Sequence, residues 1–165
     1  RGGGGALTIQ HCNTPSLEVR WAAGPVTLQD VTSAETTLRA AAAPTTVHTL
    51  HGPAELQVDG AALTLRDVQG PCQADVRGGR LSYHGAPTHE STLRTVGGPL
   101  QTHLTSAQAA LLRLSGADVT LDKAFSFNGE RTARRIEGTL NGGGPLLDFR
   151  AVQGAASCYA AEPSA

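Results

Sequence analysis

A short pattern that returns along the chain constrains this sequence more than any other feature. At residues 65–71 it reads Leu-Arg-Asp-Val-Gln-Gly-Pro, that is apolar, polar, any, apolar, any, Gly, then Pro or Ala. Further copies, some of them looser, begin at Leu28, Val47, Leu93, Leu111 and Phe149. Successive starts are 19, 18, 28, 18 and 38 residues apart, and 38 is twice 19. A period of this length is typical of solenoids, in which each repeat forms one coil.

Between these copies, apolar and polar side chains alternate, which is typical of half-buried β-strands. Gly-Pro or Ala-Pro steps interrupt the alternation at 24–25, 43–44 and 52–53. Glycine tolerates the backbone angles of tight corners, and proline fixes φ where no backbone donor is needed. We therefore expect an all-β fold, a single-stranded β-solenoid (β-helix) with rungs of 18–19 residues. The second position of the pattern is expected to face solvent, and it holds Gln29, His48, Arg66, Arg94 and Arg150.

One interval is longer than the others and predicts an inserted loop. The copies at Leu65 and Leu93 are 28 residues apart instead of 18, so about ten residues are extra. We expect the segment Gly79–Glu90 to leave the stack as a loop. Insertions in solenoids gather on one face and often carry function.

The chain is expected to form one β-solenoid domain, residues 6–159. Residues 1–5 are expected to be a flexible N-terminal segment, and residues 160–165 a frayed C-terminal tail. Trp21, the single tryptophan, is expected to cover the open end of the first coil, because solenoids need such caps. The chain has no methionine, which favours a processed product whose residues before Arg1 are unknown.

Two segments near the C-terminus vary from the repeat. Residues 141–144, Asn-Gly-Gly-Gly, are expected to form a tight turn with positive φ between the two final strands. Upstream of it lies a basic run with a glutamate close by on each side, and we expect a solvated face of paired charges rather than an anion site. The residues concerned are Glu130, Arg131, Arg134, Arg135 and Glu137.

The charge and cysteine content exclude several classes of protein. The formal net charge is −1, so the chain has no basic footprint for nucleic acid and no polybasic stretch for an anionic membrane. No apolar run approaches the roughly 20 residues that span a bilayer. The three cysteines, Cys12, Cys72 and Cys158, permit one disulfide in three pairings or none, and their spacing fits no zinc-knuckle pattern.

The closing residues carry a family resemblance. Residues 117–121, Ala-Asp-Val-Thr-Leu, and 138–154, which begin Gly-Thr-Leu-Asn-Gly-Gly-Gly, resemble the last repeats of the bacterial adhesin-domain family. The resemblance covers residues 25–158, and Ala151 and Gln153 depart from the family's usual ending. It implies a β-solenoid of cell-envelope proteins, and it carries over no catalytic residue.

Histidine is the one compositional anomaly. Six histidines occur beside a single lysine, and none lies beyond residue 103. Neutral imidazole is the commonest metal ligand, and four of them suit copper(II) or zinc(II). We consider a metal site, with copper preferred to zinc, across the base of the expected loop, against the alternative that these histidines are scattered surface residues. The candidate ligands are His48, His51, His84, His89 and His103.

These observations lead to one main hypothesis about function and one alternative. The main hypothesis is a non-catalytic structural or interaction module, adhesin-like, exported to the cell envelope, periplasmic or on the cell surface. Its partners would be other cell-envelope or surface-layer proteins. The alternative is a histidine-ligated copper or zinc protein on the same scaffold, with superoxide dismutase-like or other redox-protective activity. An enzymatic activity enters only with this alternative, and no catalytic residue is assigned.

Overall fold

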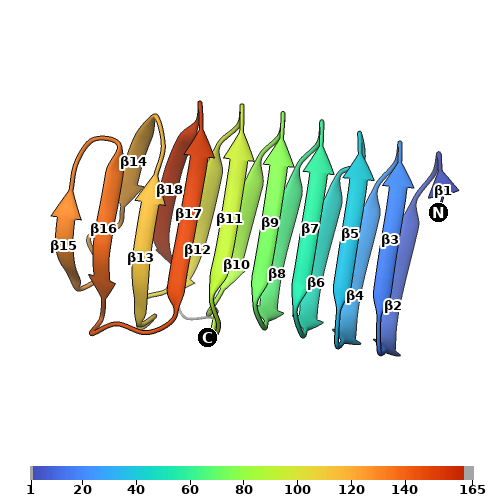
Figure 1. The fold of residues 1–165 in the computed structure, drawn as a ribbon, viewed down its shortest axis with the longest axis horizontal. Coiled ribbons are helices and arrows are strands. Elements are labelled where there is room, and N and C mark those ends of the chain that lie inside the picture. The colour runs from blue at the N-terminus through green and yellow to red at the C-terminus, as the bar shows by residue number, and fades with distance from the viewer. Residues whose placement is uncertain (1, 162–165) are drawn as a thin grey trace.

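The computed structural model describes residues 2–161, which form two facing β-sheets and no helix (Figure 1). The described residues therefore include no helix long and apolar enough to cross a membrane. The eight-stranded sheet holds, in spatial order, β14 (Asp118–Leu121), β18 (Ala155–Ala161), β12 (Leu100–Thr105), β10 (Leu81–Gly85), β8 (Leu63–Gln69), β6 (Thr45–His51), β4 (Val26–Ser33) and β2 (Leu7–Thr14). The ten-stranded sheet holds β1 (Gly2–Gly3), β3 (Leu17–Ala22), β5 (Thr36–Ala41), β7 (Ala54–Asp59), β9 (Cys72–Arg77), β11 (Ser91–Val96), β17 (Leu146–Val152), β13 (Ala110–Ser115), β16 (Arg135–Leu140) and β15 (Phe127–Arg131).

The first five coils each give one strand to each sheet, and equivalent strands pair in parallel. In the eight-stranded sheet, the paired positions are Leu7, Val26, Thr45, Leu63, Leu81 and Leu100. These positions are 19, 19, 18, 18 and 19 residues apart. The predicted β-solenoid with rungs of 18–19 residues is confirmed.

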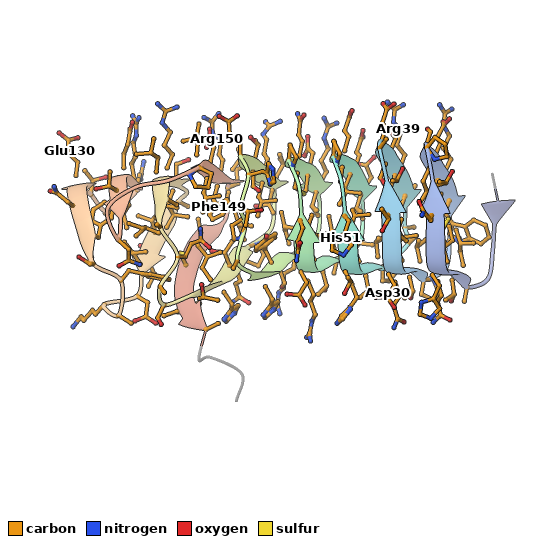
Figure 2. The ribbon with its side chains drawn as sticks, turned by 90° about the horizontal axis from the view of Figure 1, so that it is seen from below. Asp30, Arg39, His51, Glu130, Phe149 and Arg150 are labelled. Atoms are coloured by element: carbon orange, nitrogen blue, oxygen red, sulfur yellow. The ribbon has the colours of Figure 1, made fainter. Side chains whose placement is uncertain are left out.

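A single core lies between the two sheets. Leu28 and Leu65 reach it from the eight-stranded sheet, and Leu38 and Phe149 from the ten-stranded sheet, all at 0% exposure. Figure 2 shows Phe149 between the sheets, with Arg150 on the outer side. Each such aliphatic or aromatic side chain contributes roughly 1.5–3 kcal/mol by leaving water, so the stacked layers hold the fold together.

Copies of the seven-residue pattern lie in two different sheets. Those at Leu28, Val47 and Leu65 belong to the eight-stranded sheet, and those at Leu93, Leu111 and Phe149 to the ten-stranded sheet. In the first group the third residue has a positive φ, 51° at Asp30, 58° at Thr49 and 53° at Asp67. This residue bulges out of the ladder, so pattern positions one and four both face the core. In β11 there is no bulge, and Leu93 faces the core whereas Val96 faces outward.

The segment Gly79–Glu90 does not leave the stack, and that prediction is wrong. Leu81–Gly85 forms β10, which pairs in register with β8 on one side and β12 on the other. Only residues 86–90 of this segment then connect β10 to β11. The long interval arose because Leu81–Gly85 keeps the strand alternation but lacks the seven-residue pattern, and because the next copy, at Leu93, lies in the other sheet.

At the C-terminal end, strand order departs from chain order. β17 lies between β11 and β13, and β18 lies between β12 and β14, so the last coil is inserted between earlier ones (Figure 1). β15 and β16 form an antiparallel hairpin that closes the ten-stranded sheet. Residues 141–144 contain the expected positive φ, at Asn141, Gly142 and Gly143. They do not make a hairpin turn, however, because β13 separates the strands that they join.

At the N-terminal end, the glycine tract lies against the first coil. Gly2–Gly3 pairs with β3, and the indole Nε1 of Trp21 donates a hydrogen bond to the carbonyl of Gly5 at 3.1 Å. Trp21 is half-buried and packs on the core. Of the expected frayed tail, Ala160 and Ala161 belong to β18 and residues 162–165 lie outside the described residues, as does Arg1. All three cysteines are free thiols.

Candidate functional site

The five candidate histidine ligands lie on the outside of the solenoid and do not share one site. His48, His51, His84 and His103 are on outward positions of the eight-stranded sheet, and His89 is in the connection between β10 and β11. His89 Nδ1 lies 2.9 Å from the hydroxyl of Thr88, and His48 Nδ1 lies 3.0 Å from that of Thr49. These hydrogen bonds are local.

His84 and His103 do come together. They are register partners in β10 and β12, and their rings stack with centroids 4.5 Å apart and planes 1° from parallel. Tyr159 in β18 continues the same column, with its ring centroid 5.4 Å from that of His103. On the other side, Arg66 separates His84 from His48. The full column, from first coil to last, is Gln10, Gln29, His48, Arg66, His84, His103 and Tyr159.

This arrangement affects the protonation of His84. Partial burial, followed by the positive charges of His103 and Arg66, lowers the pKa of His84, and the nearby carboxylate of Asp67 opposes them. Within residues 2–161, no group of three or more His, Cys, Asp or Glu side chains is placed to hold a metal ion. The stacked pair therefore offers two imidazoles. Their spacing could have been read from the sequence, because His48, Arg66, His84 and His103 are 18, 18 and 19 residues apart.

The outer face of the ten-stranded sheet carries most of the formal charge, much of it in ion pairs. Arg113 donates to Glu137 at 3.2 Å, and Arg135 pairs with the same carboxylate. The guanidinium of Arg131 lies over the ring of Phe127, 4.7 Å from its centroid. The interactions of Arg131, Arg135 and Glu137 agree with the expected solvated, paired face.

The N-terminal end of the eight-stranded sheet is an open edge. Among the described residues, β2 has a partner on one side, β4, and none on the other. Leu7 N–H bonds to the carbonyl of Pro25, so in the alternating pattern of a parallel ladder the backbone groups of Thr8 face the open side. Val19 is buried, but the other core-facing side chains of this first coil are only partly buried: Leu7, Ile9, Cys12, Leu17 and Trp21.

This edge has one of the features that usually prevent strand pairing, a bulge at His11, and lacks the others. β2 has eight residues and contains no proline, lysine, arginine, aspartate or glutamate. Natural edge strands are usually short, charged, bulged or covered. His11 bulges at φ 50° and pairs with Asp30 at 3.2 Å, so the protection lies in the middle of the strand, and Leu7–Gln10 before it is a regular strand edge.

The opposite end of the solenoid is protected. β14, the edge strand of the eight-stranded sheet, has four residues. β15, the edge strand of the ten-stranded sheet, exposes Glu130 and Arg131 (Glu130 is labelled in Figure 2). The sequence predicted that solenoid ends need caps or partners. It could not say which end is open, because that depends on where the hairpin β15–β16 folds.

A hollow of about 380 Å³ lies near the open end, on the outer face of the ten-stranded sheet. It is lined by residues of β3, β5 and β7: Arg20, Trp21, Ala22, Arg39, Ala40, Ala41, Gln57 and Asp59. Asp59 Oδ1 is buried without a hydrogen-bond partner among the described residues, while its Oδ2 accepts from Gln57 at 3.2 Å. The N-terminal end therefore combines an open backbone edge on one sheet with a hollow on the outer face of the other.

Comparison with protein-family models, with curated proteins and with solved structures gives no match.

Proposed function

We propose that this domain is a non-catalytic interaction module of the bacterial cell envelope, adhesin-like, which docks end-on to another envelope or surface-layer protein. The observation that carries the proposal is the open edge of β2. Within residues 2–161, the eight residues of β2 have no strand partner on one side, and the apolar side chains behind them are only partly buried.

The physical argument rests on the cost of leaving such an edge open. A free strand edge presents backbone donors and acceptors that can add a further strand. The apolar side chains of the first coil would leave water at the same time, at roughly 25 cal/mol per Å² of apolar surface. A β-strand of the partner, laid along β2, satisfies both requirements.

Export to the envelope, periplasmic or at the cell surface, is supported by the resemblance of residues 117–121 and 138–154 to envelope adhesin domains. A second function, a copper or zinc protein with redox-protective activity, has one observation in its favour. That observation is the stacked pair His84 and His103. Two imidazoles make a weaker case than an open edge of eight residues, so the interaction module is preferred.

The proposal is tested by photocrosslinking in the source bacterium. A photoreactive residue replaces Thr8 on the open edge or, as the matched control, Thr120 on the short edge strand β14; both threonines are exposed. We expect an adduct with an envelope protein from position 8 and none from position 120. The backbone of Gln10 also faces the open side, and proline has no N–H to donate. The adduct should therefore disappear when Gln10→Pro is combined with the photoreactive residue at position 8.

Three results would overturn the proposal. They are a protein that fractionates with the cytoplasm, equal adducts from both positions, or an adduct that survives Gln10→Pro. Circular dichroism of the proline variant checks that the solenoid is still folded.

A further inference from the structure

The last coil of the chain occupies a slot between two coils that precede it in sequence. β17 pairs in parallel with β11 on one side and β13 on the other. β18 pairs in parallel with β12 and β14. The chain thus leaves one coil position empty after β12, builds the end of the solenoid, and returns to fill the gap (Figure 1).

The filling segment is a complete piece of core. Leu147, Phe149, Ala156 and Cys158 are all 0% exposed, so they close the interior between the coils on either side. Without this coil, β11, β12, β13 and β14 would each have an unpaired edge facing the gap. The segment that fits this slot is one with the sequence of residues 146–161, because its strands pair with all four edges and its side chains fill the core.

A single short connection ties this segment to its own slot. Residues 141–145 pass under β13 from the end of β16 to the start of β17 (Figure 1). The connection is anchored at its first residue, where Asn141 Nδ2 donates to the carbonyls of Ser106 and Gln108 at 2.9 and 2.8 Å. Gly142 follows, with φ 92° and no atom within 4 Å of where a Cβ would lie. The connection therefore has an anchored start, followed by a glycine with open space around it.

We propose that the slot also accepts residues 146–161 of a second copy of this chain, so that two chains form a dimer by exchanging their last coils. Every strand pairing and buried contact of the coil is the same in the exchanged dimer, and only the connection changes conformation. The choice between the two forms is then set by the effective concentration of the chain's own coil against that of its neighbour's. The slot stays open until residues 146–161 have been made or have refolded, which is when exchange takes place.

Two crosslinking pairs distinguish exchange from ordinary association. Thr92 in β11 and Asp148 in β17 are register partners on the outer face, so Thr92→Cys with Asp148→Cys reports which chain supplies the last coil. The control pair, Gln73→Cys with Thr92→Cys, joins β9 to β11 within one chain in either form. Cys12→Ser is included, and the native Cys72 and Cys158 are buried, which raises their thiol pKa to about 12 and about 11 and keeps them unreactive.

The protein is refolded at micromolar and at near-millimolar concentration, treated with a short crosslinker that carries two thiol-reactive maleimide groups, and run on a denaturing gel. We expect the first pair to give a band of doubled mass that grows with refolding concentration, while the control pair stays at the mass of one chain. A protein that is monomeric at every concentration overturns the proposal. So does a native dimer whose first pair crosslinks only within one chain.

Deletion of Gly142–Gly144 provides a second test. Asn141 and Pro145 alone span about 10 Å when extended, and the two strand spacings between β16 and β17 require about 9.6 Å without any allowance for turning. The shortened connection is then strained in the monomer, where it must turn to pass β13. It is not strained in the exchanged dimer, where it runs extended from one chain to the other. We expect a dimer by light scattering at all concentrations, and a folded monomer contradicts the proposal. If the deletion variant does not fold, the crosslinking pairs still decide.

Discussion

The imidazole rings of His84 and His103 stack 4.5 Å apart on adjacent strands, with Arg66 next in the same column. Partial burial and these positive neighbours lower the pKa of His84 below its ordinary value of 6.5, against the opposing charge of Asp67. In the unfolded chain the ring takes up a proton at its ordinary pKa. Between that value and the lower folded one, the unfolded state binds more protons, so stability falls as the pH falls.

We predict that His84→Gln flattens this dependence. When the pH is lowered from about 7.5 to about 5.5, the melting temperature of the wild type should fall by more than that of the variant. Scanning calorimetry at both pH values measures the difference. His89→Gln, in the connection between β10 and β11, is the control and should retain the wild-type slope. Equal slopes for wild type and His84→Gln would show that the column does not couple protonation to folding.

Copper binding separates the stacked pair from a larger site. The parallel rings direct their nitrogen lone pairs side by side, so they share an ion only after a ring rotates. We therefore predict weak binding of Cu(II) that His103→Ala abolishes and that His48→Ala with His51→Ala leaves unchanged. Equilibrium dialysis followed by metal analysis measures it, with Zn(II) as a second ion. One copper per chain that survives a chelator and is lost in the His48/His51 variant would instead favour the redox-protective alternative.

Tyr83 carries a hydroxyl in the core that finds no partner. The residue is 1% exposed, and its Oη makes no hydrogen bond within the described part of the chain. Removing an unsatisfied buried polar group while keeping the ring should stabilise the fold, so Tyr83→Phe is expected to raise the unfolding free energy by about 1 kcal/mol. Urea unfolding measures it. Tyr159→Phe, at a half-exposed position, should change stability by less than about 0.5 kcal/mol.

Gly70 marks a corner where two coils meet backbone to backbone. A Cβ there would lie 2.5 Å from the carbonyl oxygen of Gly52, at a φ of 135°. Gly97 has a φ of 77° and open space around the equivalent atom, so it serves as control. We predict that Gly97→Ala costs about 1 kcal/mol. Gly70→Ala should cost about 1–3 kcal/mol more, because the coils must separate. Equal unfolding midpoints would mean that the corner yields without strain.

The local parts of this fold could be predicted from the sequence, and the long-range parts could not. Alternation and Gly-Pro corners are properties of neighbouring residues, so the coil and its length followed directly. The seven-residue pattern was harder to interpret, because the same spacing of apolar residues has two structural meanings. In the eight-stranded sheet a bulge at Asp67 turns both apolar positions toward the core, whereas in β11, without a bulge, Leu93 faces the core and Val96 faces outward. That ambiguity produced the false loop at Gly79–Glu90.

The position of the last coil depends on which free strand edges it pairs with. Backbone hydrogen bonds are the same for every residue type, so the sequence does not show which edges those are. Phe149 and Leu114 suit the same kind of inward position, so nothing local orders β17 before β13. The same limit applied to the histidines. The pattern predicts the outward position of His48, but the contact between His84 and His103 depends on the register of β10, a segment that the sequence predicts to be a loop.

The coils between the open edge at β2 and the end that contains the inserted last coil are nearly equal in length and pair in register. The domain could therefore be lengthened by adding coils in its middle. Duplication of any 18- or 19-residue unit between β4 and β9 would add a rung without altering either terminus. Each added rung would move the two ends apart by about 4.8 Å. The number of copied units alone would then set the distance between the open edge and the closed end.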